Sequence, residues 1–170
     1  MPDANDDTVW AVREAYLNLL EFVDTASQDS GPESRKRLRE EAEQTVLMFA
    51  AAVILADGQY DPREQEFVRL FTNITGGTAK ELTYLNEYAG KWAGPAARIP
   101  DFFQVARKHD VKFGTSLAQS IMGELQFIGN NVSISDKRFR AAEIKVVNSY
   151  LHLLETFVAN FKTAEGDENV

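Results

Sequence analysis

Three carboxylates stand close together where a long apolar run ends. The run is eleven residues long, from Val46 to Ala56, and Asp57, Asp61 and Glu64 follow it within eight residues. Calcium and magnesium bind several oxygen ligands at once, and zinc also accepts carboxylates, so three carboxylates in one tight loop could supply part of a shell for any of these cations. The loop is not an EF-hand, because it lacks that motif's ligand spacing with glycine at position 6 and glutamate at position 12.

The same loop also has a purely structural interpretation. Gly58 suits the left-handed conformation that ends a helix, Asp61 suits the cap of the next helix, and Glu64 closes a capping box. On this interpretation two of the three carboxylates are used for capping and the third is solvated. The sequence is compatible with both a cation site and a pair of helix caps.

Other catalytic chemistry has little support in the sequence. His109 and His152 each lack a second histidine at metal-ligand spacing, and we expect structural roles for both. The chain has no cysteine, which removes disulfides, thiolate metal sites and cysteine nucleophiles. Phosphate-binding loops, nucleophile elbows and His-Glu-x-x-His pairs are also missing from the sequence. We therefore expect a protein that is not an enzyme.

The elements that must position these residues are helices. Apolar residues recur at helical spacing along most of the chain, and alternating strand patterns are not found. Glycine and proline residues separate seven predicted helices, at about residues 9–26, 32–56, 62–74, 78–89, 100–109, 111–129 and 137–162. We expect an all-α single domain over residues 9–162, with disordered acidic segments at 1–8 and 163–170.

The two expected helical junctions resemble each other, which suggests an internal repeat. Gly58, Asp61 and Glu64 of the first junction are echoed by Gly129, Asp136 and Glu143 in the second, at offsets that drift from 71 to 79 residues. The alternative explanation is that helical hairpins share the same capping needs wherever they occur.

Charge and length exclude several classes of protein. The 170 residues carry a net charge of -8, but residues 1–32 hold seven acids and one base, and 163–170 hold three acids. The remainder is nearly neutral, with 17 bases and 16 acids, which argues against a nucleic-acid partner. The longest apolar run is shorter than the roughly 20 residues that span a bilayer, and the first eight residues lack signal-peptide order. We expect a cytoplasmic protein without a membrane span.

Two basic clusters interrupt this balance, at residues 35–39 and 137–140. Both fit solvated helix faces, and both also fit a contact with phosphate or an acidic partner.

Three aromatic residues are candidates for binding a protein partner. Trp92 lies in a segment rich in glycine and proline, where it would either cover the core or serve as an exposed anchor. Phe102 and Phe103 are adjacent and cannot both face the same way on one helix, so we expect one of them to widen an exposed patch.

Residues 56–66 resemble the tellurite-resistance TerB-like family, whose pattern is Ala-Asp-Gly, two residues, a small polar or acidic cap, two residues and Glu. This family is also found in the N-terminal region of a membrane-anchored DnaJ-type co-chaperone. The resemblance implies about seven helices in a compact, pseudo-symmetric bundle, and a divalent cation held by acids of the junctions. Asp57 and Glu64 would be such ligands, with Asp61 as an addition.

The second junction departs from the family pattern. Asn130 and Asn131 stand where the family tends to repeat Asp-Gly, and amides bind hard cations more weakly than carboxylates do. In this part of the chain only Glu143 stands where the resemblance implies an acidic ligand.

Three functions follow from these expectations. The first is a non-enzymatic interaction domain that binds a protein partner in a bacterial stress-response or envelope-linked system, with a cation at the loop around Asp57. The second is a regulatory or recruiting domain of a larger ATPase or co-chaperone machine. The third, a metal-dependent hydrolase, requires an open coordination position and an activated water.

Overall fold

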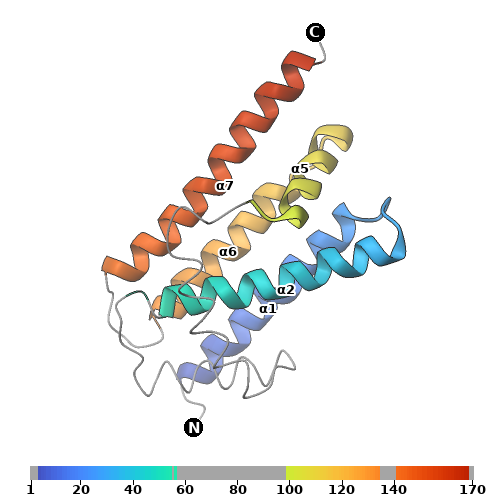
Figure 1. Ribbon diagram of the computed structural model, residues 1–170. Coiled ribbons are helices and arrows are strands. Elements are labelled where there is room, and N and C mark those ends of the chain that lie inside the picture. Colours follow the sequence, from blue (N-terminus) through green and yellow to red (C-terminus); the bar gives the residue numbers. More distant parts are fainter. Residues whose placement is uncertain (1–3, 55, 57–98, 135–140, 169–170) are drawn as a thin grey trace.

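The computed structural model describes residues 4–54, 56, 99–134 and 141–168. These residues form five helices and no strand (Figure 1). The helices are α1 (Ala4–Ala26), α2 (Pro32–Ile54), α5 (Asp101–Phe113), α6 (Leu117–Ile134) and α7 (Ala141–Glu168). The expected all-α class is confirmed for this part of the chain. The helices expected at 62–74 and 78–89 lie outside the described residues.

Several helix ends differ from the expected ones. α1 begins at Ala4 and α7 continues to Glu168, so residues 4–8 and 163–168 are helical where we expected disorder. Acidic residues favour the positive end of the helix dipole, which accounts for the early start of α1. No proline interrupts the sequence of α7, so the helix has no strong reason to stop near residue 162.

The break between α5 and α6 also lies later than expected. α5 continues to Phe113 and ends at Gly114, whose φ of 70° is the left-handed conformation that favours glycine. The Gly114 N–H donates to the Asp110 carbonyl oxygen at 2.8 Å. The predicted break near residue 110 was wrong because the apolar period continues through it, and glycine supplies the stop.

α6 continues past Gly129 to Ile134, so the prediction that Gly129 ends a helix was also wrong. Gly129 is buried, and a Cβ atom there would lie 2.8 Å from Val147 Cγ2 and 3.0 Å from Phe49 Cζ. The glycine therefore permits a close approach of α6 to α2 and α7. It also loses the junction role that it had in the suggested internal repeat.

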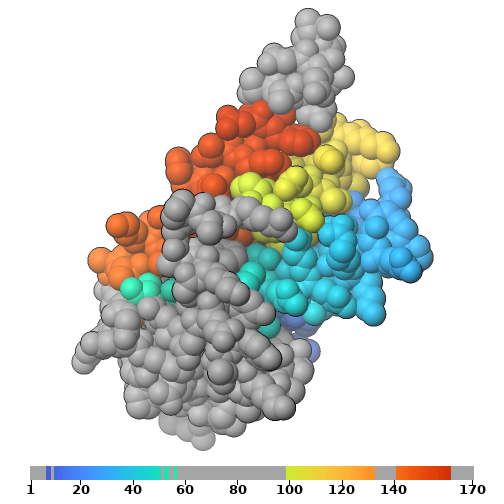
Figure 2. All heavy atoms as spheres, in the orientation of Figure 1, coloured from blue at the N-terminus to red at the C-terminus, as the bar shows by residue number. Residues whose placement is uncertain are grey.

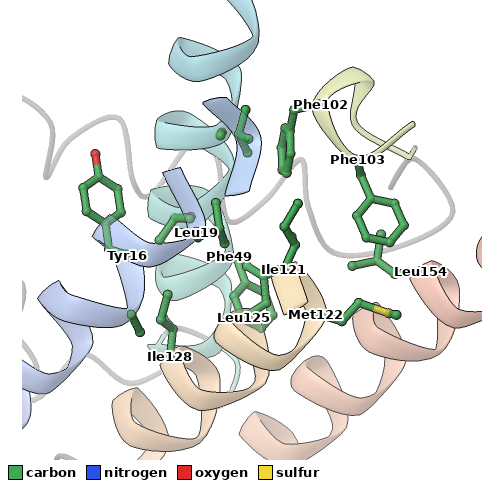
Figure 3. Packing of buried hydrophobic residues seen from close by; sticks show 14 of the residues in the cluster. Tyr16, Leu19, Phe49, Phe102, Phe103, Ile121, Met122, Leu125, Ile128 and Leu154 are labelled. Carbon is green, nitrogen blue, oxygen red and sulfur yellow. The ribbon is translucent and has the colours of Figure 1, made fainter. Parts of the chain in front are cut away.

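α6 contacts each of the other four helices, and the apolar core surrounds it. Phe49 of α2 packs on Tyr150 of α7 with ring centroids 5.2 Å apart. Phe102, Phe103, Ile121, Leu125 and other apolar side chains from all five helices fill the interior (Figure 3). Of the helices described here, none is long and apolar enough to cross a lipid bilayer.

The N-terminus of α6 is capped by a buried carboxylate from the preceding helix. The Asp110 side chain, 4% exposed, accepts hydrogen bonds from the N–H groups of Leu117 at 2.6 Å and Ala118 at 2.9 Å. It also accepts a hydrogen bond from the Thr115 hydroxyl at 2.5 Å. One side chain thus satisfies two of the first N–H groups of α6 and fixes the turn between α5 and α6.

The N-terminus of α5 is capped in a similar way, by a residue of α2. Pro100 occupies the cap position of α5 and offers no side-chain hydrogen bond. Instead, Glu41 Oε1 accepts the Phe102 N–H at 2.8 Å, and Arg37 forms an ion pair with Asp101 at 3.1 Å. These contacts hold the start of α5 against α2, and a carboxylate at this end complements the helix dipole.

We expect Gly129→Ala to lower the free energy of unfolding by about 1–3 kcal/mol, because its methyl group would overlap Val147 and Phe49. Gly123 in the same helix is the matched control, since a Cβ atom there has no neighbour within 4 Å. Gly123→Ala should raise stability by about 0.5–1 kcal/mol through helix propensity. Denaturant unfolding of both variants measures the difference, and effects of the same sign would contradict the close approach.

We expect Asp110→Ala to lower the free energy of unfolding by about 1–3 kcal/mol, because it leaves buried N–H groups of α6 without their acceptor. Asp101→Ala is the control, since it removes an acid from an ion pair at the surface and should cost about 0.5 kcal/mol. Chemical unfolding distinguishes the two, and equal losses would show that Asp110 does not act as a buried cap.

Candidate functional site

The expected acidic loop lies outside the described residues, as does Trp92. Cation binding by Asp57, Asp61 and Glu64 therefore stays a prediction. Glu143 is described; it lies in the first turn of α7 and is 1% exposed. Within the described ranges, no group of three or more histidine, aspartate or glutamate side chains comes together that could hold a metal ion.

The expected exposed patch at Phe102 and Phe103 was wrong. Both side chains are buried, at 1% and 0% exposure, and Figure 3 shows them in the core. Adjacent residues on a helix do point in different directions, but α5 contacts α1, α2, α6 and α7 and therefore buries more than one of its faces. Phe103, for example, packs on Phe157 of α7 with ring centroids 5.9 Å apart.

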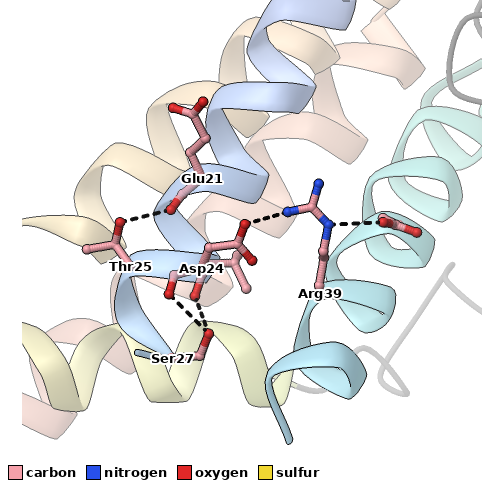
Figure 4. Close-up of polar contacts among 7 residues, drawn as sticks. Glu21, Asp24, Thr25, Ser27 and Arg39 are labelled. Carbon is pink, nitrogen blue, oxygen red and sulfur yellow. Dashed lines mark hydrogen bonds and ion pairs between the residues drawn. The ribbon is translucent and has the colours of Figure 1, made fainter. Parts of the chain in front are cut away.

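The basic cluster on α2 is engaged within the molecule. Figure 4 shows Arg39 between α2 and α1, with its guanidinium bonded to Asp24 at 2.5 Å. Arg39 also lies 3.6 Å from Glu43, and Lys36 lies 4.0 Å from Glu40. These pairs match the solvated-face interpretation of this cluster. The second cluster, at 137–140, lies outside the described residues.

An open groove of about 390 Å³ lies between α6 and α7. The volume is within the range of small-molecule sites. Eight residues line the groove: Gln119, Met122, Gly123 and Gln126 from α6, and Asn148, Leu151, His152 and Glu155 from α7.

The spacing of these residues explains how the groove forms. Positions 119, 123 and 126 are spaced i, i+4 and i+7, so they lie on one stripe of α6, and positions 148, 152 and 155 form the same stripe on α7. Met122 and Leu151, 5% and 8% exposed, lie beneath the two stripes as an apolar floor. Gly123 adds no side chain, and the space where its Cβ atom would stand is open.

The groove has a distinct chemical character. The amides of Gln119, Gln126 and Asn148 each offer a hydrogen-bond donor and an acceptor, as peptide groups do. Glu155 is the acidic residue of the lining, and neither lysine nor arginine is among the eight lining residues. The groove therefore suits a hydrogen-bonding ligand that is neutral or positively charged. Its lining holds no serine, threonine, cysteine or lysine to act as a nucleophile.

The sequence did contain a signal for this groove. Two polar stripes at helical spacing are visible in residues 119–126 and 148–155, but they look like any solvated helix face. His152, for which we expected a structural role, is exposed and lines the groove. Only the packing of α6 on α7 brings the two stripes together.

His109 keeps a structural setting at the corner between α5 and α6. Its Nδ1 atom lies 3.0 Å from the Thr115 hydroxyl oxygen, and its ring packs on Phe113 with ring centroids 4.6 Å apart.

Three large aromatic side chains of the described residues are exposed: Phe113 at 53%, Trp10 at 54% and Phe127 at 41%. Phe127 follows Gly123 by one helical turn, so it lies on the same side of α6 as the groove.

Among the residues that the structure describes, the two side chains with shifted pKa values, Glu124 and Tyr150, do not line the groove. Burial raises the pKa of Glu124 on α6, and a hydrogen bond with Asn18 of α1 partly offsets the shift. Burial also raises the pKa of Tyr150, and the negative charge of Glu41 raises it further. The first group belongs to the packing of α1 on α6 and the second to the packing of α2 on α7.

The chain matches no family model, and it matches neither a curated protein sequence nor a solved structure. The resemblance of residues 56–66 to the TerB-like family stays a prediction.

Glu124→Gln should stabilise the protein at pH 7, by about 0.5 kcal/mol or less because the side chain is partly solvated. A raised pKa means that the folded state disfavours the ionised carboxylate, so wild type gains stability as the pH falls through that pKa. Gln does not titrate, so the difference in the free energy of unfolding between the variant and wild type should shrink as the pH approaches 4. Chemical unfolding at pH 7, 5.5 and 4 measures this, and a pH-independent difference would contradict it.

Proposed function

We propose that this protein is a non-enzymatic helical interaction domain and that a segment of a partner protein binds in the α6–α7 groove. The observation that carries the proposal is the groove itself, with polar stripes on both walls and an apolar floor. Amide side chains can pair with the backbone groups of a bound chain, and the floor can take its side chains. Phe102 and Phe103 are buried, so the proposal does not use them as a binding surface.

The TerB-like resemblance supports a setting for this role in a bacterial stress-response or envelope-linked system. A cation at Asp57, Asp61 and Glu64 would then stiffen the loop after α2. As a regulatory or recruiting domain of a larger ATPase or co-chaperone machine, the protein would use the same groove.

Site-specific photo-crosslinking in cells of the source organism tests the proposal. A photoreactive residue in place of Gln126 should give a discrete cross-linked protein, because this side chain lines the groove. The same residue in place of Gln44, an exposed glutamine on α2, should not give that product.

A groove-filling variant completes the experiment. In the protein with the photoreactive residue at position 126, Gly123→Leu should remove the cross-link, because the leucine side chain occupies the groove. The domain should stay folded, because the space at this position is open. Circular dichroism and thermal unfolding check the fold. Identical products at positions 44 and 126, or a product that persists in the Gly123→Leu background, would overturn the groove as the binding site.

A further inference from the structure

The α6–α7 groove has an amide end and an acidic end. Gly129 of α6 lies against Val147 of α7, and the lining runs back along α6 to Gln119 and forward along α7 to Glu155. The two helices are therefore antiparallel, with Gln126 and Asn148 near one end of the groove and Gln119 and Glu155 near the other.

The length of the groove limits what can bind in it. Positions 119 to 126 cover seven helical steps, or about 10 Å along the axis. An extended chain rises by about 3.3 Å per residue, so about three residues of extended chain fit along the groove.

The polar walls favour an extended chain over a helix. A bound helix satisfies its backbone groups internally, so it would leave the amides of Gln119, Gln126 and Asn148 without backbone partners. It would also need a wider apolar surface than Met122 and Leu151 provide. An extended chain exposes N–H and C=O groups that these amides can pair with.

The charge of the groove selects the side chain that enters it. The Glu155 carboxylate is at one end, and neither lysine nor arginine is among the eight lining residues; His152, about one helical turn away on α7, is the one histidine of the lining. A basic side chain can also lay its aliphatic stem on the floor of Met122 and Leu151 while its charged end reaches Glu155.

From these features we infer that the groove binds an extended segment of about three residues with a basic side chain directed to Glu155. This inference rests on the proposed function, because it names the chemistry of the partner segment. Gln126 and Asn148 would pair with its backbone.

Peptide titrations followed by NMR test the inference. The probes are acetylated and amidated Ala-Arg-Ala, its neutral citrulline analogue and Ala-Glu-Ala, added to isotope-labelled protein. We expect saturable shifts at the Gly123 amide and at the side-chain amides of Gln119, Gln126 and Asn148 with the arginine peptide. The citrulline peptide should bind several-fold more weakly, and the glutamate peptide should cause no saturable shift.

Variants identify the charge that matters. Glu155→Gln should weaken binding of the arginine peptide by about threefold to tenfold and leave the citrulline peptide unchanged. Glu21→Gln, which alters an exposed acid on α1, is the matched control and should bind like wild type. Equal affinity for the arginine and citrulline peptides, no saturable shift in the groove, or equal effects of the two variants would overturn the inference.

The cross-linking experiment and the peptide titration can contradict the proposed function and the inference independently. A groove-dependent cross-link together with no binding of the arginine peptide would overturn the basic segment and leave the proposed function standing. Binding of the peptide to the groove without a groove-dependent cross-link would support the inferred chemistry and overturn the proposed role.

Discussion

The close approach of α6 to α2 and α7 at Gly129 is the constraint on which the rest of this structure depends. The absence of a side chain lets Phe49 and Val147 contact the backbone of α6 directly, at distances that any Cβ atom would prevent. Because helices pack as rigid elements, one such contact sets the separation and the register of α6 and α7 over several turns. The groove begins less than one turn away along the same pair of helices, at Gln126 and Asn148, so its geometry follows from this contact. Gly123, in the same helix, has the opposite surroundings and leaves the groove open.

Acidic side chains fix the positions of α5 and α6, because a carboxylate from another helix caps the N-terminus of each. Glu41 of α2 accepts the Phe102 N–H of α5, and Asp110 of α5 accepts two N–H groups of α6. These bonds link α2 to α5 and α5 to α6 in series, so they fix the positions of these three helices relative to one another. In the described part of the chain, these two acids are therefore used to place helices.

The sequence predicted the elements whose limits are set by local chemistry. The all-α class, the end of α1 at Ala26 and the starts of α2 and α5 follow from apolar spacing and from proline positions. Gly129 was misassigned because a glycine that ends a helix and a glycine that permits close packing look alike without the neighbouring helix. Asp110 could not be recognised as a cap, since its acceptor role depends on the turn that Gly114 creates. The groove was missed for a similar reason, because each polar stripe alone is typical of a solvated face.

The groove also constrains the kind of interaction that this protein can make. Its lining residues lie within two packed helices, so the backbone of the site loses little conformational entropy when a ligand binds. A segment of about three residues nevertheless makes few contacts, and such a site alone binds weakly. Stronger and more selective binding needs an anchor outside the groove. Phe127 is 41% exposed and lies one turn beyond Gly123, where a large side chain of a longer partner could pack against it. A partner that reaches both Glu155 and Phe127 must cross the groove along its length.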